Sequence, residues 1–153
     1  LINTFNALLE MGVIPVVNEN DSVSYTEIES EERLFGDNDM LSAVVAILCK
    51  AKRLIILSDI DGFYDSDPRF NQNAKLIQQI DTIDEGVYSL AGGAGSRRGT
   101  GGMKTKLQAA NSATAQGIDT VITNGKNPSA IYDIIEGRKV GTLFTGRNKF
   151  SSE

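Results

Sequence analysis

Histidine and tryptophan are absent from this 153-residue sequence, and cysteine occurs only once. Without histidine, the chain cannot form a Ser-His-Asp triad, a Cys/His zinc site or an imidazole acid–base pair. A single cysteine cannot form an internal disulfide, so nothing indicates an oxidising compartment. Any chemistry must therefore come from Asp, Glu, Lys, Arg, hydroxyl groups, backbone amides or a bound cation.

Long apolar runs and an excess of positive charge are lacking as well. No run approaches the roughly 20 apolar residues of a membrane span, and we recognise no signal peptide. Fifteen Lys and Arg against 20 Asp and Glu give a net charge of −5, which disfavours binding to nucleic acid or an anionic membrane. The hydrophobic fraction of 41% is that of an ordinary folded domain.

Helical and strand patterns alternate along the chain. The expected helices cover residues 1–11, 38–51, 82–90, 103–116 and 128–136, and the expected strands cover residues 12–17, 53–57, 76–80, 120–123 and 142–145. Residues 22–36 are expected to form an exposed connection or a hairpin, and residues 91–102 a glycine-rich loop. This alternation predicts an α/β fold, a three-layer α/β/α sandwich with a mainly parallel sheet.

Two polar clusters, Asn18–Asp21 and Ser58–Asp61, directly follow predicted strands. Open α/β sheets bind ligands beyond the carboxyl ends of their strands, so both clusters are candidate binding sites. Carboxylates and amides there could hold an amino group and position a metal-bound nucleotide. A simple chain turn after each strand is the alternative interpretation.

Polar residues also precede the predicted helix at 38–51, in the segment Gly36-Asp37-Asn38-Asp39. Asp37 or Asn38 would cap the helix, and acidic groups suit its positive end. Capping explains one or two of these residues. An inward-facing Asp39 could instead orient lysines around a transferring phosphoryl group.

The segment Gly99-Thr100-Gly101-Gly102-Met103-Lys104-Thr105-Lys106 is the strongest local signal. Glycines before a helix let backbone N–H groups approach an anion, which the helix dipole also attracts. Lys104 and Lys106 disfavour the helix start unless an anion compensates them. The segment matches neither the P-loop nor the GxGxxG pattern, and a flexible surface loop is the alternative. We expect a bound polyphosphate opposite a polar acceptor pocket, and electrostatic phosphoryl transfer as the reaction.

Three segments together resemble the amino-acid kinase family, and within it the glutamate 5-kinases, which phosphorylate the γ-carboxylate of L-glutamate with ATP. These are Gly12–Asp21, Phe35–Ala43 and Gly99–Lys106. The resemblance covers residues 1–147, and residues 148–153 are expected to form a tail. The chain opens at Leu1 without the family's first strand and its glycine-rich turn with a further lysine. We therefore expect a C-terminal portion of a kinase domain, with little turnover alone.

The resemblance also implies roles for individual residues. Asn20, Asp21 and Asn38 would bind glutamate. Ser58 and Asp59 would contact the nucleotide, together with a segment of Thr100, Gly101, Gly102, Met103, Lys104, Thr105 and Lys106. Lys106 would stabilise the transferring phosphoryl group, and Asp39 would orient the catalytic lysines. ATP with Mg²⁺ is the implied cofactor.

Further properties follow from the resemblance alone. They are a homo-oligomer (a dimer or a tetramer), a cytoplasmic location and feedback inhibition by proline. Two alternatives stay open, namely a family member with another acceptor, such as acetylglutamate, aspartate or a nucleoside monophosphate, and a nucleotide-binding module without catalysis. A dinucleotide-dependent oxidoreductase is disfavoured because the GxGxxG turn is missing.

Overall fold

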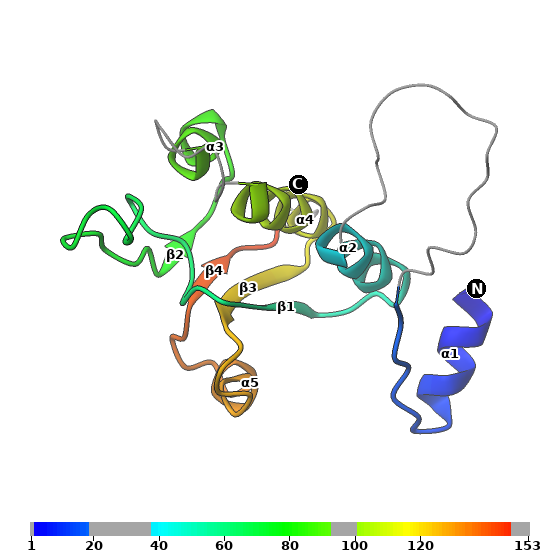
Figure 1. The fold of residues 1–153 in the computed structure, drawn as a ribbon. Coiled ribbons are helices and arrows are strands. Elements are labelled where there is room, and N and C mark those ends of the chain that lie inside the picture. The colour runs from blue at the N-terminus through cyan, green and yellow to red at the C-terminus, as the bar shows by residue number, and fades with distance from the viewer. Residues whose placement is uncertain (1, 19–37, 93–100, 148–153) are drawn as a thin grey trace, which may run out of the picture.

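The computed structural model describes residues 2–18, 38–92 and 101–147. Five helices and four strands occur in these residues (Figure 1). The helices are α1 (Ile2–Glu10), α2 (Asn38–Leu48), α3 (Glu85–Gly92), α4 (Gly101–Ala115) and α5 (Ala130–Ile135). The strands are β1 (Arg53–Ser58), β2 (Gln79–Ile80), β3 (Asp119–Asn124) and β4 (Thr142–Phe144).

The strands form one mixed sheet in the order β1-β3-β4-β2. β1 pairs with β3 in parallel and β2 pairs with β4 in parallel, whereas β3 and β4 are antiparallel. The expected α/β fold with a mainly parallel sheet is therefore confirmed. β3 lies inside the sheet and its four central residues are buried, as expected for a strand covered on both faces.

Helices cover the sheet on both faces. Figure 1 shows α2, α3 and α4 on one side and α5 on the other. Small side chains let α2 and α4 approach closely, because Ala43 on α2 and Ala109, Ala110 and Ala113 on α4 are fully buried. They join one apolar core with larger residues of the sheet, including Leu54, Ile56, Ile122 and Phe144. This packing holds the start of α4 beside the start of α2.

The predicted buried strand at residues 12–17 is wrong. Residues 13–17 form neither strand nor helix, and Ile14 and Val16 are 86% and 95% exposed. A strand needs hydrogen bonds to a neighbour, and no strand among the described residues pairs with this segment. Apolar, β-branched composition alone did not decide its structure.

Several predicted boundaries also shift. α3 begins at Glu85 and not at residue 82, because the Asp84 carboxylate caps the helix by accepting a hydrogen bond from the Val87 N–H at 3.0 Å. Helix α3 ends at Gly92 and helix α4 begins at Gly101, so both ends of the predicted loop at 91–102 are helical. The predicted strand at 76–80 narrows to β2, with a single bridge between Tyr64 and Leu76.

The remaining elements agree more closely. α2 is shorter than predicted and ends before Lys50, whose positive φ of 51° takes the chain out of the helix. α5 covers Ala130–Ile135 of the predicted 128–136. The expected connection at 22–36 and the tail at 148–153 lie outside the described residues. None of the helices in the described ranges has the length and apolar character needed to cross a membrane.

Candidate active site at the carboxyl ends of β1 and β3

The site begins where two parallel strands end together. Ser58, the last residue of β1, is in register with Asn124, the last residue of β3. The Gly125 N–H donates a 2.8 Å hydrogen bond to the Ser58 carbonyl oxygen, so the pairing continues one residue into the loop. The polar residues that follow each strand therefore emerge at one edge of the sheet, where α/β proteins bind ligands.

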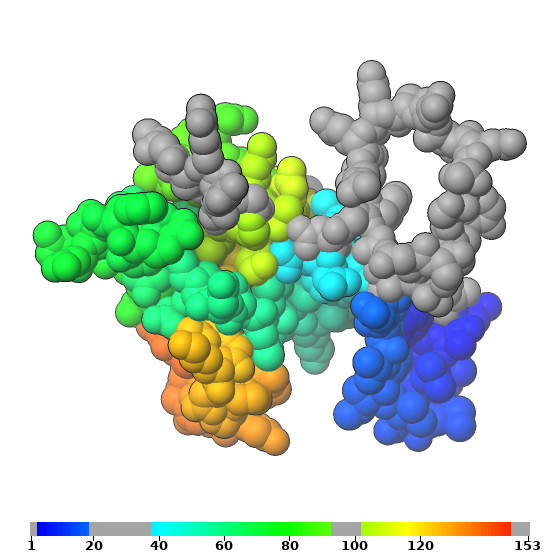
Figure 2. Space-filling model, in the orientation of Figure 1, coloured from blue at the N-terminus to red at the C-terminus, as the bar shows by residue number. Residues whose placement is uncertain are grey.

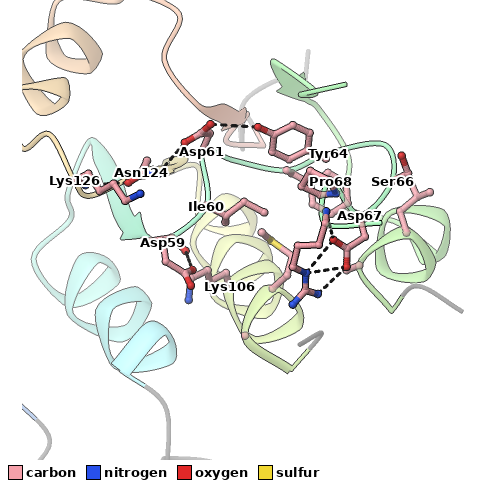
Figure 3. A pocket seen from close by; sticks show the side chains of 17 residues that line it. Asp59, Ile60, Asp61, Tyr64, Ser66, Asp67, Pro68, Lys106, Asn124 and Lys126 are labelled. Atoms are coloured by element: carbon pink, nitrogen blue, oxygen red, sulfur yellow. Dashed lines mark hydrogen bonds and ion pairs between the residues drawn. The ribbon is translucent and has the colours of Figure 1, made fainter. Parts of the chain in front are cut away.

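A pocket of about 720 Å³ opens at this edge (Figure 3). Its walls come from the loops after β1 and β3, the end of α3 and the first turns of α4. The lining residues are Ser58, Asp59, Ile60, Asp61, Phe63, Tyr64, Ser66, Asp67, Pro68, Arg69, Leu90, Ala91, Gly102, Met103, Lys106, Asn124 and Lys126. Its size lies within the range of small-molecule sites, and both charge signs are present on its walls.

Lys106 in the pocket wall is held by Asp39 from the first turn of α2. Lys106 Nζ lies 2.9 Å from Asp39 Oδ2, and the two side chains are only 18% and 14% exposed. A partly buried pair of this kind loses water, which strengthens the attraction between its charges. The lysine is thereby kept at a defined place on the pocket wall.

Thr105, next to Lys106 on α4, contacts the same carboxylate oxygen. Its hydroxyl lies 3.0 Å from Asp39 Oδ2 and 2.9 Å from the Gly102 carbonyl oxygen, so its single proton can be donated to either acceptor. The Ser42 hydroxyl donates to the Asp39 backbone carbonyl at 2.6 Å. The starts of α2 and α4 are thus joined by polar contacts behind the pocket.

On the opposite wall, the loop after β1 is tied to the end of β3. Asn124 Nδ2 donates to Asp61 Oδ1 at 2.8 Å, and the Tyr64 hydroxyl donates to Asp61 Oδ2 at 3.3 Å. Burial raises the pKa of Tyr64, and the neighbouring Asp61 carboxylate raises it further. Tyr64 therefore stays protonated at neutral pH and can act as a hydrogen-bond donor.

Arg69 forms a third side of the pocket. Its guanidinium makes a forked ion pair with the Asp67 carboxylate, with a closest distance of 2.7 Å. The hydrogen bonds from Arg69 lower the pKa of Asp67 and raise that of Arg69. The Arg69 guanidinium also stacks 5.7 Å from the ring centre of Phe70. Because the Arg69 side chain is 57% exposed, water screens the pair and it contributes little to stability. A bound anion could compete for the guanidinium.

A model of the amino acid kinase family matches residues 1–124. The chain belongs to the amino acid kinase family. It is 54% identical over 145 residues to the glutamate 5-kinase of Clostridium perfringens, covering 95% of this chain and 54% of that protein. It is 54% identical over 147 residues to the glutamate 5-kinase of Clostridium acetobutylicum, covering 96% of this chain and 53% of that protein.

Solved structures show the same fold. A product complex of isopentenyl phosphate kinase from T. acidophilum superposes with a TM-score of 0.52 and 26% identity, over 69% of this chain and 38% of that one. The chain spans about half the length of the curated relatives it matches. The resemblance to the amino acid kinase family, stated above from three sequence segments, is thus confirmed.

Most of the candidate residues that lie within the described ranges are found in or directly behind the pocket. Ser58, Asp59, Gly102, Met103 and Lys106 line the pocket. Asp39 and Thr105 lie directly behind Lys106. Ser58 and Asp59 contact one another, with 3.3 Å between the Ser58 hydroxyl and Asp59 Oδ1. The roles predicted for all these residues stay predictions.

Other candidates lie apart from this group or outside the described residues. Lys104 is exposed on α4 and does not line the pocket, and Asn38 is exposed at the start of α2. Gly101 begins α4. Asn20, Asp21 and Thr100 fall outside the residues that the structure describes.

Several pocket residues were not predicted from the sequence, among them Arg69, Asn124 and Lys126. For Asn124 and Lys126 the sequence does contain a signal. They follow a strand that the pattern did predict, and Gly125 between them is a turn residue. The rule that drew attention to Ser58–Asp61, polar residues after a buried strand, would have found them too.

The donor groups in the pocket fit a metal ion that arrives with a nucleotide. No group of three Asp, Glu, Cys or His side chains that could hold a metal occurs in the described residues. In kinases Mg²⁺ needs only one or two carboxylates, since phosphates and water supply the other ligands. Asp59 is an exposed carboxylate on the pocket wall and meets that requirement.

Proposed function

We propose that this chain forms part of an ATP-dependent kinase that phosphorylates the γ-carboxylate of L-glutamate to L-glutamyl 5-phosphate, the first step of proline biosynthesis. Glutamate 5-kinases at 54% identity support the choice of acceptor. One structural observation carries the proposal, namely the Lys106 cation in the pocket wall, held by Asp39 where β1 and β3 end. Residues 1–147 would belong to the kinase domain and residues 148–153 would be a tail.

In this reaction a γ-carboxylate oxygen of glutamate forms a bond to the γ-phosphorus of ATP, and the bond from that phosphorus to the bridging oxygen breaks to release ADP. The protein need only position the two substrates and offset the charge that shifts towards ADP. Lys106 can supply that positive charge, and its ion pair with Asp39 keeps the ammonium group in place between turnovers.

The remaining pocket residues would bind the nucleotide. Ser58 and Asp59 offer a hydroxyl and a carboxylate at the end of β1, and Asp59 would be the protein ligand of Mg²⁺ carried by ATP. Thr100 to Lys106 would hold the phosphates at the start of α4, where backbone N–H groups face an anion. Bound Mg²⁺ would supply further positive charge to the phosphates.

Glutamate would bind on the α2 side of the site. Asn38 adjoins Asp39 at the start of α2 and is exposed there. Asn20 and Asp21 would complete this part, with Asp21 accepting from the α-ammonium group. A carboxylate for the ammonium group and amide donors for the carboxylate are the groups that a free amino acid needs.

An assay with hydroxylamine on the natural full-length protein tests the proposal. Acyl phosphates react with hydroxylamine to give hydroxamates, whereas phosphate esters and phosphoanhydrides do not. With ATP, Mg²⁺ and L-glutamate we expect ADP and hydroxamate in equal amounts. Hydroxamate from aspartate or acetylglutamate alone would indicate a different acceptor. ATP binding without ADP release from any acceptor would favour the non-catalytic module.

Lys106→Ala tests the residue that carries the proposal. We expect kcat to fall by about 10²–10³-fold, the usual loss when a charge-stabilising group is removed. Lys139→Ala removes an equally positive, exposed side chain outside the pocket and should leave kcat unchanged. Equal rates in the two variants would contradict the assignment of Lys106.

The relationship to glutamate 5-kinases also leads us to propose a cytoplasmic homo-oligomer, a dimer or a tetramer, inhibited by proline. Light scattering during size-exclusion chromatography would give the number of subunits. Adding L-proline to the hydroxamate assay would reveal inhibition, and D-proline is the matched control.

A further inference from the structure

Asn124 at the end of β3 uses both ends of its side-chain amide. Nδ2 donates to Asp61 Oδ1 at 2.8 Å, and Oδ1 accepts from the Lys126 backbone N–H at 2.9 Å. An amide bound at both ends has only one orientation, because exchanging its oxygen and nitrogen would break both bonds. The half-buried Asn124 side chain is therefore fixed in place.

The groups joined in this way all belong to the pocket (Figure 3). Asp61, Tyr64, Asn124 and Lys126 line it, and the Tyr64 hydroxyl donates to the second oxygen of Asp61. The Asn124–Asp61 bond connects loops that are 63 residues apart in sequence. It is a hydrogen bond to a charged acceptor, a stronger class than a bond between neutral groups.

The sheet itself does not depend on this bond. β1 and β3 are already paired along six residues, and the Gly125 N–H extends the pairing to Ser58. The loop after β1 is anchored separately, since the Phe63 N–H donates to the buried Thr142 hydroxyl at 2.8 Å. What Asn124 adds is a defined position for the Asp61 carboxylate and for the backbone of Lys126.

We propose that Asn124 is a positioning residue for nucleotide binding. It fixes the loop residues Asp61 and Lys126 so that the pocket wall is in place before the nucleotide arrives. This inference rests on the proposed function, because it takes the pocket to be the ATP site. The expected consequence is selective, namely weaker ATP binding with little change in kcat, since Asn124 lies on the wall opposite Lys106 and Asp39.

An exchange of the two partners gives a sharp test. Asn124→Asp keeps the acceptor for the Lys126 N–H but replaces the donor to Asp61 with a second carboxylate. The double variant Asp61→Asn/Asn124→Asp restores the bond in the reverse direction and leaves acceptors for Tyr64 and Lys126. Asn127→Asp is the control: it adds the same charge to the same loop, outside the pocket, and keeps the acceptor for Ser129.

On the natural full-length protein we expect Asn124→Asp to raise the Kd and the KM for ATP by about tenfold, with kcat within about twofold of wild type. In the double variant the Kd and the KM for ATP should return to within about twofold of wild type. In Asn127→Asp both should equal those of wild type. ATP binding by Asn124→Asp equal to that of Asn127→Asp would overturn the proposal. So would a folded double variant that shows no recovery.

If Asn124→Asp does not fold, Asp61→Asn and Asp61→Ala serve instead. Asn at position 61 keeps an acceptor for the Asn124 side chain, whereas Ala removes it. ATP should therefore bind at least about threefold more weakly to Asp61→Ala than to Asp61→Asn. Equal binding by these two variants would overturn the proposal.

Hydrogen exchange separates this proposal from the proposed function. Without any nucleotide, the amides of residues 59–65 should exchange faster in Asn124→Asp and return to wild-type rates in the double variant. A wild-type protein that binds no ATP would refute the proposed function and leave this readout intact. Unchanged exchange in Asn124→Asp would refute the positioning role, whatever ATP does.

Discussion

Asp39 and Asp133 both pair with cations, but they lose different amounts of water. Asp39 and its partner Lys106 are 14% and 18% exposed, whereas Asp133 and its partner Arg138 are 42% and 58% exposed. Water weakens the attraction between Asp133 and Arg138 much more than the attraction between Asp39 and Lys106. The carboxylate of Asp39 is therefore the one whose charge affects both folding and the position of Lys106.

We predict that Asp39→Asn lowers the free energy of unfolding by about 1–3 kcal/mol, because it leaves a partly buried ammonium group without its anion. The matched variant Asp133→Asn should cost less than about 1 kcal/mol. Urea denaturation of both variants measures the difference. Equal losses would show that burial of the Asp39–Lys106 pair has no energetic consequence.

The pH dependence of stability can be followed at Asp65. Its Oδ1 accepts the Lys75 backbone N–H at 2.9 Å and the Ser66 hydroxyl at 3.1 Å. The Lys75 hydrogen bond is the main cause that lowers the pKa of Asp65. The unfolded chain therefore takes up the proton first as the pH falls. This contribution to stability is complete above the ordinary aspartate pKa of about 4 and is lost below it.

Asp65→Ala should accordingly be less stable than wild type at pH 7, and the difference should shrink as the pH drops below about 4. Thermal unfolding of both proteins between pH 3 and 7 provides the measurement. A gap in Tm that stays constant over this range would contradict the predicted linkage.

At the scale of elements, two glycines between β3 and β4 have positive φ for different reasons. Gly137 and Gly141 have φ of 82° and 68°. An added Cβ at Gly137 would meet nothing within 4 Å, whereas one at Gly141 would lie 2.2 Å from the Ile122 carbonyl oxygen. Position 141 therefore requires glycine for two reasons, namely its positive φ and the close approach of its Cα to β3.

We predict that Gly137→Ala costs about 1–2 kcal/mol, the penalty of a left-handed conformation for a residue with a Cβ. Gly141→Ala should cost roughly 2 kcal/mol more, because neighbouring backbone must also move. Chemical denaturation of the two variants compares them directly. Similar losses would show that the backbone at Gly141 can yield without cost.

At the scale of the whole molecule, the N-terminal part stands apart. Figure 2 shows residues 2–18 separated from α5 by a hollow. Met11, Ile14 and Val16 are exposed on this part, and Leu57 is exposed on β1, an edge strand of the described sheet. Apolar side chains and an open strand edge together favour association with other chains.

We predict that Ile14→Lys/Val16→Lys reduces self-association of the 153-residue chain, since it replaces two apolar contacts with charges. Stability should change by less than about 0.5 kcal/mol, because neither side chain is buried. The control Asn3→Lys/Gln72→Lys adds the same charge at exposed polar positions. Light scattering over a concentration series would show the contrast, and equal association of both variants would exclude the apolar segment as its cause.

Local patterns in the sequence were sufficient for the α/β class, for a helix over most of the residues of α4, and for the polar residues that follow β1. Helical periodicity and turn residues act over a few positions, so one chain segment contains the information. Three segments also carried the resemblance to the amino acid kinase family. None of these predictions required knowledge of contacts between distant residues.

Only the tertiary structure decided that Lys106 and not Lys104 faces Asp39, that Asn124 holds Asp61, and that residues 13–17 form no strand. Each depends on a partner elsewhere in the chain: 67 residues separate Asp39 from Lys106, and 63 separate Asp61 from Asn124. Hydrogen bonds and ion pairs form between whichever groups packing brings together, and strands exist only through their neighbours. Local sequence patterns do not contain that information.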